Sequence, residues 1–348
     1  MAASRKNKDA SRFSLGTLTA AGVGAALGLR KALRSRFQFS GRTVLITGGS
    51  RGLGLVMARL LLKEGARVAI CGREETSLER AREELERAGG EVLAIPCDVR
   101  DPVQVEALVS AVHERWGAVD VLINNAGVIQ VGPVESMTME DFREAVDTHL
   151  WAPLYTTLAV LPEMKRRGEG RIVNIASVGG KVSIPHLVPY AASKFALVGL
   201  SDGLRAELRQ AGILVTTVCP GLLRTGSPKN SWFKGNHEAE YAWFTLGDSL
   251  PLMSMNAEAA ARKILSACRR GDAEALVGLP AKLAAVGRAL APNLTAGITA
   301  FVSRNLPQDS TPDRVRGTES ETPLTLSWLT ELTRRAAERN NENEVPIH

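Results

Sequence analysis

Short apolar runs recur along the chain from residue 42 and are separated by longer segments with helical periodicity. Each run is apolar without alternation, which is typical of a strand buried on both faces of a helix-covered parallel sheet. We expect seven such strands, within RTVLITGG at 42–49, ARVAICG at 66–72, EVLAIPCDV at 91–99, VDVLINNAG at 119–127, GRIVNIAS at 170–177, ILVTTVCPG at 213–221 and EALVGL at 274–279.

The segments between these runs have apolar residues at i, i+3 and i+4, the spacing of a helix with one buried face. The first three are GLVMARLLLKEG at 54–65, EETSLERAREELERAG at 74–89 and DPVQVEALVSAVHERWG at 101–117, and two longer segments follow. Strands that alternate with helices through right-handed crossovers form a doubly wound sheet. The pattern therefore predicts one α/β domain over residues 41–280, built on seven parallel strands with helices on both faces.

Three parts of the chain do not follow this alternation. Residues 226–255 interrupt it after the sixth strand, and residues 281–348 form a C-terminal extension that starts with an amphipathic segment and ends in a polar tail. Residues 1–40 form a leader with an uncharged stretch at 13–29 between basic residues. This stretch is short for a spanning helix, so a membrane anchor, a signal segment and an amphipathic leader all stay open.

Composition adds two restrictions. Hydrophobic residues make up 45% and charged residues 23% of the chain, as in ordinary soluble domains. The net charge of +6 comes from the leader, where eight basic residues face one acid, so it indicates a membrane surface before nucleic acid. The four cysteines lie far apart without a C-x-x-C pair, and we expect buried, reduced thiols in a cytoplasmic setting and no metal site.

A glycine-rich turn follows the first strand and reads Thr47-Gly-Gly-Ser-Arg-Gly-Leu-Gly54. Glycines at this point permit a tight turn and let backbone N–H groups approach a pyrophosphate at the positive end of the next helix. The second strand then ends at Cys71-Gly72-Arg73 without an acid that could bind an adenosine ribose. Arg51 and Arg73 flank the expected position of a 2′-phosphate, so NADP(H) is favoured over NAD(H).

Tyr190 and Lys194 are spaced to share one face of a helix. A lysine cation at ~4 Å could supply roughly the 4 kcal/mol that brings a phenol pKa from about 10 toward 7. Ser177 ends the fifth strand, at the sheet edge where ligands bind in such folds. We expect Tyr190 to transfer a proton to or from a substrate oxygen that the Ser177 hydroxyl also contacts.

Taken together, these motifs resemble those of the short-chain dehydrogenase/reductase superfamily. The resemblance covers residues 41–280 and adds Asp98, NNAG at 124–127 and PGLLRT at 220–225. It implies a Rossmann-type sheet, hydride transfer to or from a nicotinamide, and a Lys194 that also binds the nicotinamide ribose. The cofactor-binding residues it implies are Gly48, Ser50, Arg51, Gly52, Leu53, Gly54, Arg73, Asp98, Val99, Asn125, Ala126, Gly127, Tyr190, Lys194, Pro220, Gly221, Leu223 and Thr225.

One position departs from the family pattern. Val146-Asp-Thr-His149-Leu stands where the family usually has asparagine, which helps to hold a water bonded to the lysine. A histidine can donate or accept a hydrogen bond and can titrate near neutrality. His149 is therefore a fourth candidate catalytic residue, or else a bulky replacement that slows the proton relay.

Aromatic residues are only 5% of the chain, yet they are dense within residues 226–255, where they indicate an apolar substrate lid or, alternatively, a loop packed on the domain.

We expect an NADP(H)-dependent oxidoreductase that interconverts a carbonyl and an alcohol on an apolar substrate. The alternatives are a cofactor-binding protein that has lost catalysis and a membrane-tethered scaffold. The resemblance implies a homodimer or homotetramer formed through helices near 139–167 and 190–210. The residues expected to form the apolar lid at 226–255 are Trp232, Phe233, Tyr241, Trp243, Phe244, Met253 and Met255.

Overall fold

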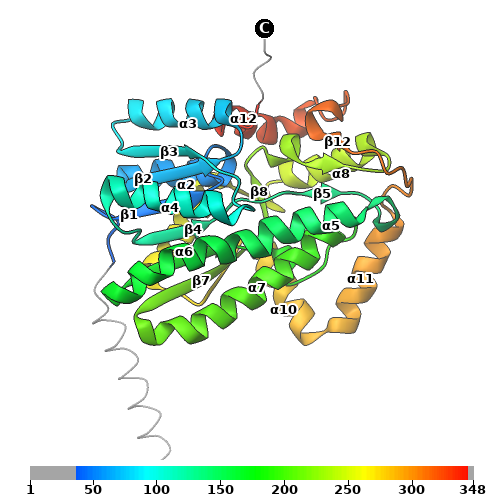
Figure 1. Cartoon of the computed structure of the whole chain (residues 1–348). Helices are drawn as coiled ribbons and strands as arrows, with labels where there is room; N and C mark the ends of the chain where they lie inside the picture. Colours follow the sequence, from blue (N-terminus) through cyan, green and yellow to red (C-terminus); the bar gives the residue numbers. More distant parts are fainter. Residues whose placement is uncertain (1–36, 344–348) are drawn as a thin grey trace, which may run out of the picture. The chain divides into compact units, whose positions relative to one another are not determined.

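Seven strands form one parallel sheet in the computed structural model, which describes residues 37–343 (Figure 1). Their order is β11-β7-β6-β4-β1-β2-β3, and every neighbouring pair runs parallel. All seven expected apolar runs are confirmed as strands. Their bounds are β1 Thr43–Thr47, β2 Arg67–Gly72, β3 Val92–Pro96, β4 Val121–Asn124, β6 Gly170–Ile175, β7 Ile213–Pro220 and β11 Glu274–Val277.

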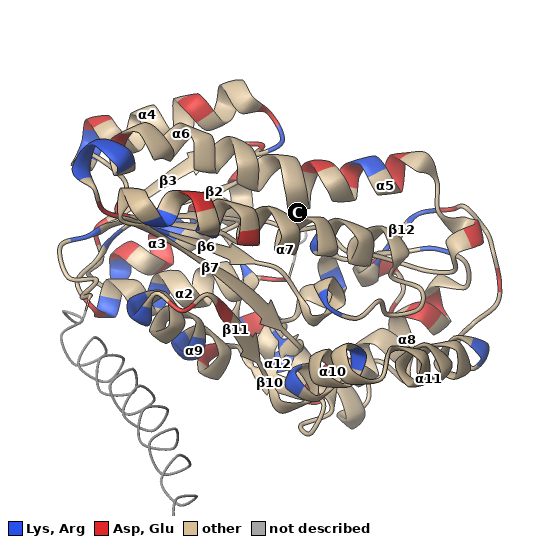
Figure 2. Ribbon diagram, turned by 90° about the horizontal axis from the view of Figure 1, so that it is seen from below, with Lys and Arg blue, Asp and Glu red and all other residues tan. Residues whose placement is uncertain are grey.

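Helices cover both faces of this sheet, as the alternation predicts (Figure 2). On one face α2 packs against α9, and α3 packs beside β3. On the other face α4 packs against α6, and α5 packs against α7. Their bounds are α2 Gly52–Lys63, α3 Glu75–Arg87, α4 Pro102–Trp116, α5 Met139–Val146, α6 Ala152–Arg167, α7 Val188–Leu208 and α9 Ala257–Arg270.

The last crossover departs from the expected right-handed rule. The steps from β1 to β2 and from β7 to β11 run in opposite directions along the sheet. Their helices, α2 and α9, nevertheless pack against each other on the same face. The two crossovers therefore have opposite hands, which is uncommon for parallel strands. The chain between β7 and α9 carries a whole lid segment, and this length lets it reach the other face.

The lid segment contains α8 (His237–Ser249) and two strand pairings that the hydrophobic pattern does not predict. β9 (Trp232–Phe233) lies between β5 (Gln130–Val131) and β12 (Val315–Arg316) in a three-stranded sheet. β8 (Leu222–Arg224) pairs with β10 (Ser254–Asn256). These short sheets attach the lid to the chain that follows β4 and to the C-terminal extension.

The C-terminal extension belongs to the same compact unit as the sheet, which comprises residues 39–348. It contains α10 (Leu279–Leu290), α11 (Pro292–Arg304) and α12 (Glu331–Arg339), and α12 packs against α8. Residues 1–38 are a separate unit, and the uncharged stretch at 13–29 lies outside the described residues. Within residues 37–343, no helix is long and apolar enough to cross a membrane.

Candidate active site

A cleft of about 1030 Å³ opens at the carboxyl ends of the central strands. Parallel sheets bind ligands at this edge, and the volume is that of a small-molecule site. The four candidate catalytic residues line it, and so does every expected cofactor-binding residue except Gly54. The structure thus brings together residues that lie as far apart in the sequence as Gly48 and Thr225.

The glycine-rich turn needs its glycines for backbone reasons. Gly48 and Gly52 have φ angles of +63° and +56°, in the left-handed region that favours glycine. A Cβ on Gly48 would lie 2.8 Å from the Ala126 Cα, and one on Gly54 would collide with the Gly48 carbonyl oxygen. Gly54 therefore shapes the turn from behind without lining the cleft. The Asn125 amide supports the turn by donating to the carbonyl oxygens of Thr47 and Gly48, at 3.1 and 2.9 Å.

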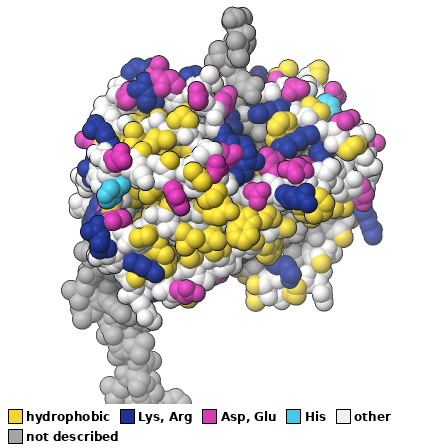
Figure 3. All heavy atoms as spheres, viewed as in Figure 1, with side chains coloured by type: hydrophobic (Ala, Val, Ile, Leu, Met, Phe, Trp, Pro, Cys, Tyr) yellow, Lys and Arg dark blue, Asp and Glu magenta, His cyan; other side chains and the backbone are white. Residues whose placement is uncertain are grey.

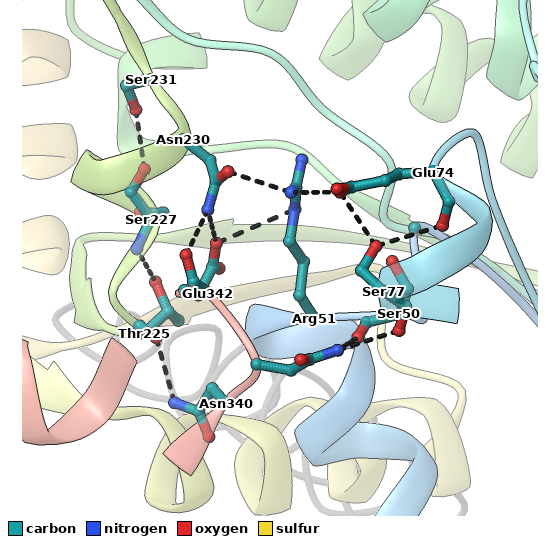
Figure 4. A network of polar contacts seen from close by, with 12 residues as sticks. Ser50, Arg51, Glu74, Ser77, Thr225, Ser227, Asn230, Ser231, Asn340 and Glu342 are labelled. Atoms are coloured by element: carbon teal, nitrogen blue, oxygen red, sulfur yellow. Dashed lines mark hydrogen bonds and ion pairs between the residues drawn. The ribbon is translucent and has the colours of Figure 1, made fainter. Parts of the chain in front are cut away.

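The two arginines expected to bind a 2′-phosphate differ in their surroundings. Arg73 is exposed and has no hydrogen bond or ion pair among residues 37–343. The Arg51 guanidinium instead donates to Asn230 Oδ1 at 3.0 Å and to Glu74 Oε2 at 3.4 Å. Figure 4 shows Arg51 between Glu74 on one side and Asn230 with Glu342 on the other. Only Arg73 is thus free to receive a new anion without losing a present partner.

Asp98 forms a paired contact with a neighbour that sequence reasoning did not single out. Arg100 donates from Nε to Oδ1 and from one terminal nitrogen to Oδ2, at 3.0 and 2.6 Å. Although burial acts to raise the pKa of Asp98, these bonds and the charge of Arg73 lower it overall. Asp98 is therefore an anion at neutral pH, and Arg100 adds a third guanidinium to this end of the cleft.

Ser177, Tyr190 and Lys194 meet at the other end of the cleft. Ser177 follows β6 and accepts from the Gly179 N–H at 3.0 Å, which orients its hydroxyl. Tyr190 and Lys194 lie one turn apart on α7, and the lysine Nζ is 5.6 Å from the centre of the tyrosine ring. The same Nζ donates to the Ile175 carbonyl oxygen at 2.9 Å. The expected face-sharing of the two α7 residues beside a strand-end serine is confirmed by this geometry.

The expected effect of Lys194 on Tyr190 is not found. Burial raises the pKa of the Tyr190 phenol, and a hydrogen bond with Ser177 offsets part of that rise. Burial also lowers the pKa of Lys194 to about 7. Burial thus disfavours the cationic form of Lys194, and this weakens the attraction that a lysine cation would exert on a phenolate. In this structure Tyr190 is a protonated phenol near neutrality.

His149 is fully buried in a π-helical turn, Asp147–Trp151, between α5 and α6. Its Nε2 accepts from the Val128 N–H at 3.1 Å, so its Nδ1 carries the proton toward Ser193 Oγ at 2.8 Å. Burial and the charge of Lys194 hold the pKa of His149 well below its usual range. The expectation that it titrates near neutrality is therefore wrong. Both ring nitrogens have protein partners, and the ring packs edge-on against Tyr190 with centroids 5.4 Å apart.

The aromatic residues of the lid pack mostly on one another. Phe233, Tyr241 and Phe244 are buried together with Val131 and Leu187 in a small apolar core. Of the seven lid residues expected to face a substrate, only Trp232 and Phe244 line the cleft. The alternative interpretation, a loop packed on the domain, is therefore correct for most of them. A buried contact of 2.6 Å between His186 Nδ1 and Glu240 Oε1 attaches α8 to the loop before α7.

Several cleft residues were not predicted from the sequence. Asn230, Asp248 and Glu342 all line the cleft, and burial raises the pKa of Asp248 to about 8. These residues lie in the lid or near the C-terminus and belong to no recognisable motif. Their position depends on the small sheets and on the packing of α12 against α8.

All four cysteines are free and buried, as expected.

Comparison with known proteins places these features in context. The model of the short chain dehydrogenase family matches residues 42–234. The ketoacyl reductase HetN of Nostoc is 42% identical over 182 residues, which cover 52% of this chain and 63% of HetN. Dehydrogenase/reductase SDR family member 7B of Danio rerio is 40% identical over 225 residues, covering 62% of this chain and 73% of that protein.

Solved structures agree with these matches. An actinorhodin polyketide ketoreductase variant crystallised with NADPH has a TM-score of 0.60 at 35% identity, covering 70% of this chain and 97% of that one. A short-chain dehydrogenase from Streptomyces avermitilis has a TM-score of 0.66 at 29% identity, covering 77% and 99% respectively. Both structures therefore share the overall fold of this chain.

Proposed function

This chain belongs to the short-chain dehydrogenase family, and from that premise we propose that it is an NADP(H)-dependent oxidoreductase that interconverts a carbonyl and an alcohol. The observation that carries the proposal is the convergence of Ser177, Tyr190 and Lys194 at one end of a dinucleotide-sized cleft. A protein that only binds the cofactor has no need of a hydroxyl, a phenol and an amine at this point. The known ketoacyl reductases among its relatives support a carbonyl substrate.

The cleft residues fit NADP(H) in their chemistry. Gly48 and Gly52 form a tight turn into the N-terminus of α2, and a helix N-terminus favours an anion such as a pyrophosphate. Arg73 offers a guanidinium without a present partner for the 2′-phosphate, and no acid stands at the end of β2 to favour an unphosphorylated ribose. The relative crystallised with NADPH supports the same choice.

The protein groups divide the chemistry as follows. When bound, the cofactor supplies or accepts the hydride. The Ser177 hydroxyl binds the substrate oxygen and keeps it within reach of Tyr190. The Tyr190 phenol, whose pKa is raised by burial, holds the proton that a carbonyl oxygen needs as it becomes an alcohol. A phenol that keeps its proton at neutral pH is in the form that carbonyl reduction requires.

Part of the cleft is apolar. Ile129, Ile184, Leu187, Leu222 and Phe244 line it together with Trp232. The guanidinium groups of Arg314 and Arg316 also line the cleft and stand over the Trp232 ring, at 4.0 and 4.6 Å from its centre, so cationic groups border this hydrophobic surface. We therefore propose a hydrophobic ketone or a lipid-like carbonyl as the substrate class.

NADPH oxidation measured against a panel of ketones and aldehydes of increasing chain length tests this function. We expect turnover to increase with apolar length and to be lost in Tyr190→Phe. Tyr155→Phe is the matched control, because Tyr155 lies on α6 outside the cleft and should keep full activity. Equal turnover in Tyr190→Phe and the wild type would refute the mechanism. NADPH binding without turnover of any compound would favour the alternative of a cofactor-binding protein.

The face formed by α5, α6 and α7 fits self-association. Figure 3 shows apolar side chains gathered in a band across this face, and Trp151, Leu158 and Phe195 are exposed there. Exposed apolar bands of this kind mark interfaces. We propose that two copies pair through α6 and α7. Light scattering should then show a dimer or tetramer for the wild type and a monomer for Leu158→Glu.

The α10–α11 hairpin fits an anionic lipid surface. In α11 no residue is buried, and Leu290, Leu294 and Phe301 are exposed. The ribbon of the two helices carries only basic charges, at Lys282, Arg288 and Arg304 (Figure 2). Exposed apolar side chains beside basic ones are typical of helices that lie in a membrane interface. We propose that the enzyme works at such a surface.

Vesicle sedimentation of the full chain tests the membrane proposal. We expect binding to vesicles that contain phosphatidylglycerol, weaker binding to pure phosphatidylcholine, and loss of the difference in a Leu294→Glu/Phe301→Glu variant. A variant that binds vesicles as the wild type does but changes oligomeric state would show that the hairpin contacts a second copy instead.

A further inference from the structure

The chain crosses the glycine-rich turn a second time, just before its C-terminus. Residues 340–343, which we call the strap, follow α12 and lie against the start of α2. The Gly52 N–H, the first of that helix, donates to the Asn340 carbonyl oxygen at 2.8 Å. The Asn341 amide donates to the carbonyl oxygens of Ser50 and Ser77, at 2.8 and 2.9 Å. The strap is therefore hydrogen-bonded both to the glycine-rich turn and to α3, which border the expected phosphate site.

Glu342 points from the strap into the cleft and is only 4% exposed. Its carboxylate accepts from the Asn230 amide at 2.6 Å and lies 3.8 Å from Arg51 Nε (Figure 4). It also fills the space beside Gly52, where a Cβ would lie 2.5 Å from Oε1. The side chain thus occupies the area that the glycine leaves open.

The strap also reaches the lid side of the cleft. The Asn340 amide donates to the Thr225 carbonyl oxygen at 3.1 Å, and Asn230 donates to the Glu342 backbone oxygen at 2.9 Å. Four residues therefore join the glycine-rich turn to the chain that enters the lid. The groups they engage, an N-terminal helix N–H and an arginine, are those that bind phosphate oxygens in dinucleotide sites.

We propose that Glu342 sets the affinity of this protein for its dinucleotide by competing with the cofactor's phosphate groups for Arg51, while the Asn340 carbonyl oxygen occupies the first N–H of α2. The proposal rests on the cofactor site described under Proposed function. A carboxylate and a pyrophosphate are both anions, so the dinucleotide binds fully only when Glu342 is displaced or protonated. The strap then acts as a built-in competitor that raises the cofactor concentration needed for saturation.

The ionisation of Glu342 is set by the groups that face it. Burial raises the pKa of Glu342 to about 7, whereas Arg51 and Asn230 act to lower it. Asp248 of α8 faces the same space, and each of these two acids disfavours ionisation of the other. Glu74 forms an ion pair with Arg51 on the side away from Glu342, so the positive charge of Arg51 is shared between two acids. Competition should therefore strengthen as the pH rises from 6 to 8.

Direct binding of NADPH and NADH, followed by fluorescence at pH 6 and pH 8, tests the proposal. At pH 8 we expect Glu342→Gln to bind both dinucleotides about tenfold more tightly than the wild type, because the change removes one like charge near the pyrophosphate. At pH 6 the gain should shrink. Glu338→Gln changes an exposed acid on α12 that does not line the cleft, so it is the control and should bind as the wild type does.

A second variant keeps the test decisive if Glu342→Gln does not fold. Asn341→Ala removes the bonds to Ser50 and Ser77 and should also tighten dinucleotide binding. Unchanged or weaker binding in a folded variant would overturn the competition. Failure of every form, wild type included, to bind either dinucleotide would instead refute the proposed cofactor site.

Discussion

The two ends of the cleft are built in different ways. At the catalytic end, Ser177, Tyr190 and Lys194 come from β6 and α7, which are neighbours in the sequence, and they are held by burial and few polar bonds. At the phosphate end, Arg51 is held by Glu74, Asn230 and Glu342, which come from three distant parts of the chain. The first end is suited to setting proton affinities, and the second to exchanging one anion for another.

Substitutions at the catalytic end should therefore change turnover, and those at the phosphate end should change binding. After Tyr190→Phe, the largest effect is expected for Ser177→Ala. Loss of the hydroxyl that holds the substrate oxygen should lower kcat by about 10²- to 10³-fold, with the Kd for NADPH unchanged. Steady-state kinetics and fluorescence titration measure the two quantities. An equal loss of NADPH affinity would contradict the expectation that the catalytic end determines turnover and the phosphate end determines binding.

Arg73→Glu should show the opposite behaviour. Because the Arg73 guanidinium is exposed and without a present partner, reversing its charge should weaken NADPH about 100-fold and NADH only slightly. Arg87→Glu, at the exposed far end of α3, is the control. Equal losses for NADPH and NADH would refute a 2′-phosphate contact, and kcat at saturation should stay near that of the wild type.

The pH dependence of stability should differ in sign between the two ends. Lys194 has a pKa of about 7 in the folded protein and 10.5 ordinarily, so the unfolded chain binds more protons between these values. Its contribution to the free energy of unfolding therefore rises as the pH increases from 7. Glu342 has a pKa of about 7 against 4.5, so its contribution falls as the pH rises from 4.5 to 7.

Denaturant unfolding at several pH values measures these slopes. Lys194→Met should remove part of the rise above pH 7, and Glu342→Gln should remove part of the fall below it. Each variant should gain about 2 kcal/mol over the wild type on its unfavourable side of neutrality, Lys194→Met below pH 7 and Glu342→Gln above it. Parallel pH profiles for the wild type and both variants would contradict the buried environments on which this comparison depends.

The smallest effect is expected for His149→Asn, which introduces the residue usual for the family. An asparagine cannot reach both Val128 and Ser193, so the Val128 N–H loses its acceptor. We expect a loss of about 1 kcal/mol in stability and a small loss in kcat with no change in its pH optimum. A shifted pH optimum would show that His149 titrates during turnover and takes part in proton transfer.

The sheet and the catalytic end could be predicted because their signals are local. A strand buried on both faces is a continuous apolar run, and Tyr190 with Lys194 is a helical spacing that can be read directly. The π-helical turn at His149 and the two-residue strand β9 leave no such periodic signal. The pKa of Tyr190 was misjudged because it depends first on how deeply the Tyr190 phenol itself is buried.

The phosphate end could be predicted only in part. Arg51 and Arg73 follow from their places after β1 and β2, where a dinucleotide phosphate is expected. Asn230 and Glu342 lie in polar segments without motif or periodicity, and their meeting depends on α12 packing against α8. The glycine-rich turn can be recognised from the local sequence, whereas the residues that cover it are determined by long-range packing.

The most direct test of the central claim follows a hydride from NADPH to product. NADPH that carries two deuterium atoms at C4 of the nicotinamide ring should be incubated with a hydrophobic ketone accepted by the protein, and the alcohol analysed by mass spectrometry. The account predicts deuterium on the carbinol carbon with the wild type and with Tyr155→Phe, and almost no alcohol with Tyr190→Phe. Alcohol without deuterium, or equal labelled product from Tyr190→Phe, would contradict it.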